Sequence, residues 1–240
     1  MPEFIRTLLY ALRAVRYTGN NVTCPVCNRS FRKFIPGGND RRPNARCPAC
    51  DALERHRLFG LFLKRKTSLL SGNQPLLHFA PERCFWHLFS GRQRDRYITA
   101  DLQSPLAAVH TDITNLVFTD QQFDAIICLH VLEHISSDVA ALGELYRVLK
   151  PGGEVLIMTP VDQTLELTVE DREDSTEEER TRRFGAPDHL RLYGRDFSKR
   201  LENAGFSVEA VDFYGELDDA TRRRYVLLPE ELIYRCTKPV

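Results

Sequence analysis

Four cysteines near the start of the sequence have the spacing of a metal-binding site. Cys24 and Cys27 lie in the stretch CPVC, and Cys47 and Cys50 lie in CPAC nineteen residues further on. Four thiolates carried by two short turns can surround a zinc ion as a tetrahedron. We therefore predict a structural zinc ribbon over residues 22–51. Two disulfides or a pair of redox dithiols are the alternatives, and they fit less well because a cytoplasmic chain keeps its thiols reduced.

The remaining cysteines and the turn of the ribbon have simpler interpretations. Cys84, Cys128 and Cys236 are scattered along the chain, and each is interpreted as a small buried hydrophobic residue. The glycine-rich and polar stretch at residues 36–40 predicts the hairpin tip between the two cysteine pairs.

A second stretch combines histidine and glutamate. His130-Val131-Leu132-Glu133-His134 fits H-x-x-E-H, the inverted zinc-peptidase signature. That chemistry needs both histidines on one face of a helix, with the glutamate activating a zinc-bound water. Here the stretch begins at the end of a strand-like apolar run and continues into candidate helix caps. We therefore interpret Glu133 and His134 as residues at a helix entry rather than as metal ligands.

The elements around this stretch predict a parallel sheet. An apolar run at residues 125–129 has the length of a strand, residues 138–149 have the apolar periodicity of a helix, and residues 155–158 form a second apolar run. The Pro-Gly-Gly stretch at 151–153 predicts the turn that ends the helix. Two strands joined by a covering helix form a βαβ crossover, and ligands bind at the carboxyl ends of such strands.

The same alternation continues on both sides and predicts an α/β fold. Further strands are expected at 76–79, 97–100, 108–110, 206–213 and 232–236, and helices at 83–90 and 195–204. The expected organisation is an N-terminal helix at 1–21, the zinc ribbon at 22–51, a connecting helix at 52–73 and a domain at 74–240. Within that domain, residues 161–187 form an acidic insertion, with nine acidic residues between positions 162 and 179, and are expected to be an exposed helix or lid.

Charge is distributed unevenly along the chain. Its 240 residues carry no net charge, but residues 1–66 contain 14 Lys or Arg against 4 Asp or Glu, which gives +10, and the rest carries −10. The basic part can meet a polyanion, or it can dock on the acidic part of its own chain. The cluster Arg55, His56 and Arg57 is interpreted as a solvated helix face or a phosphate contact. No apolar run has the length of a membrane span, and we expect a soluble, cytoplasmic protein.

Five fragments in order give a family resemblance. They are YITADL, HTDIT, FDAIICLHVLEHI, ELYRVLKPGGEVLIMTP and LENAGF. With these fragments, residues 74–240 resemble the class I S-adenosylmethionine-dependent methyltransferases of the methyltransferase-11-like kind. The resemblance implies a Rossmann-like, seven-stranded sheet with a reversed final hairpin, and S-adenosylmethionine as the cofactor.

The resemblance also assigns cofactor-binding positions. Asp101, followed by Leu102, matches the acid that holds the ribose hydroxyls, and Asp112 with Ile113 matches the pair beside the adenine. Leu129 and His130 match the residues that face the methionine end and the acceptor.

The first loop departs from the family pattern. It reads LLHFAPERC, with His78 at the position of an acid, followed by Phe79, and with Ala80 and Glu82 at the positions of two glycines. Glycines allow a close backbone approach, and Pro81 removes a donor. Glu82 is the candidate replacement for the missing acid.

Histidines and a polar corner supply the candidate acceptor side. If the acceptor is a hydroxyl or an amine, His130 is the first candidate base and His189 the second. Either could instead hydrogen-bond the backbone. Asp188, His189, Arg191 and Tyr193 follow the acidic insertion and are predicted to bind the acceptor, with Arg191 suited to a carboxylate or phosphate. The alternative is a loop held by local salt bridges.

Three functions are consistent with these residues. The first is methyl transfer to a small-molecule or glycan-type acceptor. The second is RNA methylation, with the basic ribbon holding the nucleic acid, although only Phe31 and Phe34 are available there for stacking on bases. The third is a methyltransferase-like binding module without catalysis.

Overall fold

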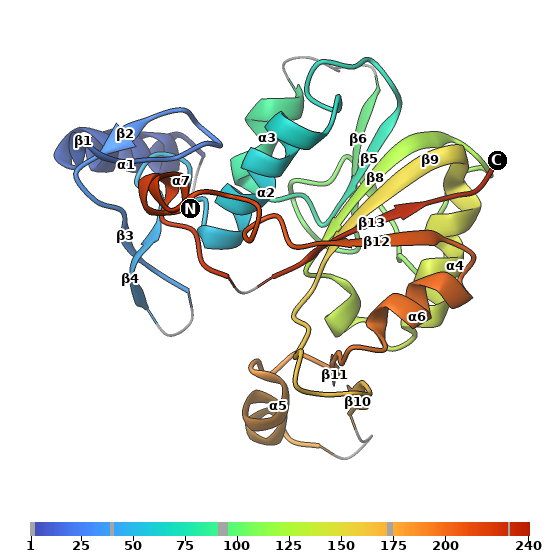
Figure 1. Ribbon diagram of the computed structural model, residues 1–240. Coiled ribbons are helices and arrows are strands. Elements are labelled where there is room, and N and C mark those ends of the chain that lie inside the picture. Colours follow the sequence, from blue (N-terminus) through green and yellow to red (C-terminus); the bar gives the residue numbers. More distant parts are fainter. Residues whose placement is uncertain (1–2, 39–40, 91–95, 172–174, 230) are drawn as a thin grey trace. The chain divides into compact units, whose positions relative to one another are not determined.

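The chain divides into two compact units, each of which is described separately. The computed structural model describes residues 3–38, 41–90, 96–171, 175–229 and 231–240 (Figure 1). Unit 1 consists of Met1–Gly72, Glu82–Arg94 and Asp212–Glu230, and unit 2 consists of Asn73–Pro81, Asp95–Val211 and Glu231–Val240. Two segments from within the predicted domain at 74–240 therefore belong to unit 1. Among the helices of the described residues, none has the length and apolar content needed to cross a membrane.

Unit 1 is built around one buried helix and two short hairpins. Antiparallel pairing joins β1 (Thr18–Thr23) to β2 (Ser30–Phe31) and β3 (Ile35–Gly37) to β4 (Arg42–Arg46). Part of the predicted hairpin tip, residues 39–40, lies outside the described residues. The helices of the unit are α1 (Glu3–Arg16), α2 (Glu54–Lys66), α3 (Arg83–Ser90) and α7 (Asp219–Tyr225).

Helix α2 is the core of this unit because aromatic side chains pack on it from distant segments. The ring of Phe59 lies 5.6 Å from that of Phe85 in α3, and the ring of Phe62 lies 5.4 Å from that of Phe213. The interpretation of residues 55–57 as a solvated face is wrong for His56, which is buried, and for Arg57, which is fully buried. Its guanidinium reaches four backbone carbonyls, and these hydrogen bonds replace solvent.

Unit 2 contains the predicted seven-stranded sheet, which confirms the α/β fold class. The strand order is β12-β13-β9-β8-β5-β6-β7, and only β13 runs antiparallel to its neighbours (Figure 1). The strands are β5 (Leu76–Phe79), β6 (Tyr97–Asp101), β7 (Val109–His110), β8 (Phe123–Leu129), β9 (Leu149–Met158), β12 (Ser207–Val211) and β13 (Ile233–Thr237). Central strands β5 and β8 are almost entirely buried, as their mainly apolar sequences predict.

The central crossover is positioned by a cap and a bulge. Helix α4 (Asp138–Val148) follows the short 3-10 turn η1 (Leu132–His134), and the Ser137 side chain caps it by accepting a hydrogen bond from Ala140 N. The prediction of a separate turn at 151–153 is wrong, because β9 already begins at Leu149. Phe123 pairs with Leu149, and Ala125 pairs with Glu154, so the single residue Asp124 of β8 lies opposite residues 150–153 of β9. Gly152 has φ +74°. The glycines therefore form a bulge inside the strand.

The acidic insertion carries a small structure of its own. Strand β10 (Val169–Glu170) pairs with β11 (Arg191–Leu192), and helix α5 (Glu177–Phe184) lies between them in sequence. The last helix of the unit is α6 (Phe197–Asn203). Most side chains of α5 are exposed or half-buried, and Thr176 and Glu179 form a capping box at its start. Figure 1 shows α5, β10 and β11 grouped together away from the strands of the main sheet.

Candidate functional site

A pocket opens in unit 2 at the carboxyl ends of β5, β6 and β8. Its volume is about 790 Å³. The strands are parallel, so residues that follow their ends come together at one edge of the sheet. The lining residues are Phe79, Ala80, Asp101, Leu102, Gln103, Asp112, Ile113, Thr114, His130, Val131, His134, Ile135, Ser136, Asp188 and Leu190. The predicted cofactor positions Phe79, Ala80, Asp101, Leu102, Asp112, Ile113 and His130 all lie in this set.

The two aspartates in the pocket are held by their own turns. Asp101 Oδ1 accepts hydrogen bonds from Gln103 N at 2.7 Å and from Ser104 N at 2.6 Å. Within the described part of the chain, its second oxygen has no hydrogen-bond partner. Asp112 Oδ1 accepts from both N and Oγ1 of Thr114 at 2.8 Å, and these bonds lower the pKa of Asp112. Both side chains are therefore pre-oriented before any ligand arrives.

Ala80 takes the backbone conformation that the family pattern gives to glycine. Its φ is +51°, in the left-handed region, and its N–H donates to Ala100 O at 2.8 Å. A residue with a Cβ adopts this conformation at a cost of roughly 1–2 kcal/mol. The loop after β5 thus keeps a sharp turn without the glycine.

Two residues predicted for the first loop are not in the pocket. His78 is fully buried in β5, and its Nδ1 lies 2.7 Å from Tyr97 Oη. Glu82 belongs to unit 1, where its Oε1 lies 3.9 Å from His56 Nε2. Neither side chain lines the pocket. The pocket therefore does not contain the predicted replacement acid.

His130 sits at the end of β8 between two carboxylates. Its φ is +52°, its Nδ1 lies 3.2 Å from Glu133 Oε1, and its Nε2 lies 2.8 Å from Glu231 Oε2. Burial lowers the pKa of His130, but contacts with these two carboxylates and their charges outweigh burial and raise it to about 9. His130 is therefore a cation at neutral pH. Leu129, immediately before it, is buried and does not line the pocket.

The predicted acceptor corner has two different parts. Asp188 lines the pocket, while His189 stands half-buried beside it. Arg191 is buried and donates to the carbonyls of Leu132, Ile135 and Ser136. Tyr193 is fully buried, and its hydroxyl lies 3.1 Å from Asp138 Oδ2. Arg191 and Tyr193 thus hold the loop between β8 and α4, and neither lines the pocket.

Several site residues were missed by the sequence reasoning. Gln103 and Thr114 lie two residues after the key aspartates, and this spacing is the signal of an Asx turn. Glu231 carried no such signal, because it is 101 positions from His130 in the sequence. Only the tertiary structure brings it to His130.

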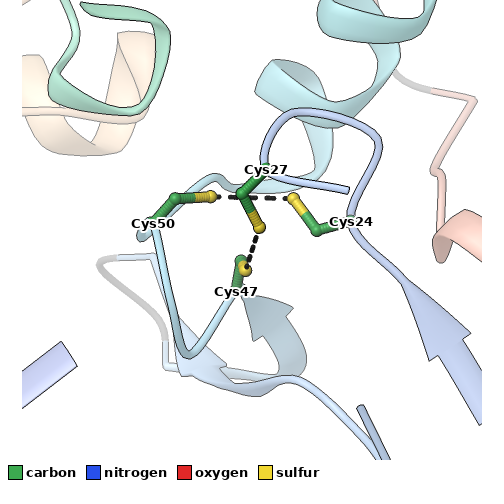
Figure 2. Close-up of side chains that lie close together, drawn as sticks. All are labelled: Cys24, Cys27, Cys47 and Cys50. Atoms are coloured by element: carbon green, nitrogen blue, oxygen red, sulfur yellow. Dashed lines mark hydrogen bonds between the residues drawn. The ribbon is translucent and has the colours of Figure 1, made fainter. Parts of the chain in front are cut away.

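In unit 1 the four predicted cysteines converge (Figure 2). The Sγ atoms of Cys24 and Cys50 are 3.6 Å apart, those of Cys27 and Cys47 are 3.7 Å apart, and all four lie within 4.8 Å of one another. A zinc ion 2.3 Å from each sulfur puts neighbouring sulfurs about 3.8 Å apart. The cluster therefore has the size of a zinc tetrahedron, and the cysteines are free rather than paired in disulfides.

Both cysteine pairs are carried by the same backbone turn. Asn28 N donates to Cys24 O at 2.8 Å, and Asp51 N donates to Cys47 O at 3.0 Å. Asn28 and Asp51 each have positive φ, which asparagine and aspartate tolerate better than other side chains. The sequence thus closes two equivalent knuckles.

Positive charge surrounds the cysteine cluster. Lys64 donates to Pro25 O and to Asn28 Oδ1 on the first knuckle. Arg57 donates to Ala45 O and Ala52 O, which flank the second cysteine pair. Four thiolates around Zn²⁺ carry a net charge of about −2, and these two cations offset it. The donor set and its surroundings therefore fit zinc.

Comparisons with known proteins agree with the fold of unit 2. A model of the methyltransferase domain matches residues 89–157. The S-adenosylmethionine-dependent methyltransferase of Mesorhizobium loti superposes with a TM-score of 0.51 over 75% of this chain and 97% of its own, at 13% identity. The chain has the methyltransferase fold. The 4+2 cyclase SpnF shares this fold, with a TM-score of 0.54, 19% identity and coverage of 77% of this chain and 81% of its own.

A curated relative matches a shorter stretch. Demethylmenaquinone methyltransferase of Staphylococcus epidermidis is 39% identical over 69 residues, which is 29% of this chain and 28% of that protein. Because the methyltransferase fold hosts more than one reaction and the match is partial, the fold by itself does not assign an activity.

Proposed function

We propose that this protein binds S-adenosylmethionine in the pocket of unit 2 and transfers its methyl group to a small-molecule or glycan-type acceptor. The observation that carries the proposal is Asp101 at the end of β6, which lines the pocket, with one oxygen held by its own turn and the other without a hydrogen-bond partner among the described residues. A carboxylate oxygen in this place can accept hydrogen bonds from ribose hydroxyls. Asp112 supplies a second acceptor for the exocyclic amine of adenine.

On the acceptor side, we propose different roles for the polar residues. His130 carries a proton on each ring nitrogen at neutral pH, so in the free protein it orients groups as a donor and acts as a base only after losing a proton. His189 remains the second candidate for a catalytic role, and Asp188 contacts the acceptor. Arg191 and Tyr193 act as positioning residues through the loop that they hold.

The decisive experiment uses a substitution that leaves the turn intact. Asp101→Asn retains Oδ1 for the N–H groups of Gln103 and Ser104 but replaces the second acceptor oxygen by an amide donor. A hydrogen bond to a charged group contributes about 1.5–3 kcal/mol, so calorimetry should show affinity for S-adenosylmethionine falling roughly 10- to 100-fold. Glu209→Ala, on exposed β12, is the control and should bind normally. Equal affinity in the two variants would refute the ribose assignment.

A related measurement separates the enzyme from a binding module. If both S-adenosylmethionine and its demethylated product release or absorb heat on binding and raise the unfolding temperature of the protein, the result supports an enzyme. Absence of both effects, with either compound, would favour a module that has lost catalysis.

We also propose that Cys24, Cys27, Cys47 and Cys50 bind a structural zinc ion. The support is the separation of the sulfurs, the paired knuckles and the neighbouring cations. Bound metal would then contribute directly to the folding free energy of unit 1, because the four ligands come together only in the folded chain.

RNA methylation is the second candidate, favoured by the charge of +10 over residues 1–66. Against it, Phe31 and Phe34 are 2% and 1% exposed, and Arg57 lies over the Phe34 ring at 4.3 Å. Neither phenylalanine is available to stack on a base. RNA binding through the basic segment should weaken steeply with added salt, and a titration that detects no salt-sensitive binding would remove this candidate.

A further inference from the structure

Three side chains of metal-ligand type converge beside the pocket of unit 2, away from the cysteine cluster. Glu133 and His134 lie on η1, and His189 lies on the loop before β11. Their ligand atoms are all within 4.8 Å of one another, and the two imidazole rings are 4.8 Å apart at 80°. Sequence alone joined His130 with Glu133 and His134, whereas the fold joins the latter two with His189.

The backbone on both sides of this cluster is fastened. Leu190 N donates to Glu133 O at 2.8 Å, which fixes the residue after His189 against η1. Arg191, one residue further on, donates to Leu132 O at 2.7 Å and Ser136 O at 3.0 Å. The loop that carries His189 and the turn that carries Glu133 are therefore held together without any ligand.

Hydrogen bonds set the tautomer of both histidines. His189 Nδ1 lies 2.9 Å from Phe184 O, and His134 Nδ1 lies 3.1 Å from Asp188 O and 3.3 Å from Asp188 Oδ2. A carbonyl oxygen can only accept, so Nδ1 carries the hydrogen in each ring and Nε2 keeps its lone pair. Metal-binding histidines have this arrangement, in which the second nitrogen donates to a carbonyl or carboxylate.

Glu133 supplies a buried acceptor to the same point. Its side chain is 1% exposed, Oε2 accepts from Thr159 Oγ1 at 2.9 Å, and Oε1 has no hydrogen-bond partner among the described residues. Among the described residues, Oε1 forms an ion pair with His130 Nδ1 at 3.2 Å, and His130 has Glu231 as a second carboxylate partner. A buried carboxylate oxygen in this state is stabilised by an added positive charge.

We propose that Glu133, His134 and His189 bind a divalent first-row transition-metal ion through Glu133 Oε1 and the two Nε2 atoms. Two imidazoles and one carboxylate suit Mn²⁺, Fe²⁺, Co²⁺ or Zn²⁺, and three protein ligands leave coordination positions for a substrate. His134 lines the pocket together with Ser136 and Asp188. A second step rests on the proposed methyl transfer: the site would favour an acceptor with a hydroxyl group, because the metal would bind and acidify that hydroxyl.

The test measures metal binding without cofactor or acceptor, so its result is independent of methyl transfer. Protein loaded with one zinc ion per chain, which the cysteine cluster takes in preference to nitrogen and oxygen ligands, is titrated with Mn²⁺, and the free ion is followed by electron paramagnetic resonance. Thiolates prefer softer metals, so the cysteine cluster does not compete for Mn²⁺. We expect about one bound Mn²⁺ per chain, and binding weakened at least tenfold in His189→Ala and in His134→Gln.

His110→Ala, which changes an exposed histidine on β7, is the matched control and should bind Mn²⁺ like the unchanged protein. Circular dichroism checks that each variant is folded, and the two histidine variants serve as replicates if one is not. Mn²⁺ binding that survives in both would place the ion elsewhere and overturn the proposal. So would the lack of a site for both Mn²⁺ and Co²⁺ in the zinc-loaded protein.

Discussion

At the scale of single residues, two side-chain-bearing positions adopt the left-handed backbone at the edge of the pocket. Ala80 follows β5 with φ +51°, and His130 follows β8 with φ +52°. Such conformations are uncommon outside glycine and concentrate where a chain must turn sharply beside a ligand. At Ala80 the missing glycine changes the energetic cost of the turn, but the turn itself is retained.

Replacing Ala80 by glycine tests this cost. Ala80→Gly removes the strained Cβ, and although glycine loses more entropy on folding, we expect the free energy of unfolding to rise by about 0.5–1 kcal/mol. Urea unfolding measures the change. Ala140→Gly is the control, because Ala140 lies in helix α4 and has no positive φ. The free energy of unfolding of this variant should fall by up to about 1 kcal/mol. A loss of stability in Ala80→Gly as large as in this control would contradict the strain argument.

At the scale of elements, the glycines inside β9 form a bulge in the sheet rather than a separate turn. A Cβ built on Gly153 would lie 2.8 Å from Asp124 O and 3.0 Å from Lys150 O, so the backbones leave no room for a side chain. The bulge lies between the first register pair of β9 with β8 and the remaining pairs, and β8 is the strand that delivers His130.

Two glycine-to-alanine substitutions compare the effect of an added side chain in the bulge with its effect in an ordinary helix. Gly153→Ala should lower the free energy of unfolding by about 1–3 kcal/mol, because either strand must shift to make room. Gly143→Ala is the control, since a Cβ there meets nothing within 4 Å in helix α4, and it should raise stability by about 0.5–1 kcal/mol. Thermal unfolding of the two variants gives the comparison. Equal effects would mean that the bulge accommodates a side chain.

At the scale of the whole molecule, unit 1 joins residues from three distant parts of the chain. Arg57 in α2 donates to Ala45 O beside the cysteine knuckle. It also donates to Tyr225 O and Val226 O at the end of α7, both at 2.7 Å. The guanidinium is fully buried, so each of these bonds replaces solvation that the carbonyls lost. The cysteine cluster and α7 are thereby connected through one side chain.

Zinc removal should consequently affect α7 as well as the hairpins. We expect purified protein to hold about one zinc per chain, and a chelator to lower amide protection in β1–β4 and in Asp219–Tyr225. Elemental analysis and hydrogen exchange measure the two effects, and added zinc should restore protection. If protein purified under reducing conditions contains no zinc, the metal assignment is contradicted. If the chelator leaves hydrogen exchange in α7 unchanged, the connection through Arg57 is contradicted.

Local patterns in the sequence determined the fold class and the groups capable of chemistry. Apolar runs of strand length fixed β5 and β8, and the two C-x-x-C pairs identified the sulfur cluster, because these signals lie within a few consecutive residues. The order of five fragments placed Asp101 and Asp112 at strand ends.

What only the tertiary structure decided was which of these groups meet. Glu231 reaches His130, Arg57 reaches α7, and His189 joins Glu133 and His134 at distances that no local pattern encodes. Such contacts depend on the sheet order and on loops closed over many residues, and a periodicity of 2 or 3.6 residues carries no information about them. For the same reason Glu82, placed in the first loop by sequence, belongs to the other unit, and Arg191 and Tyr193 hold the backbone that shapes the pocket.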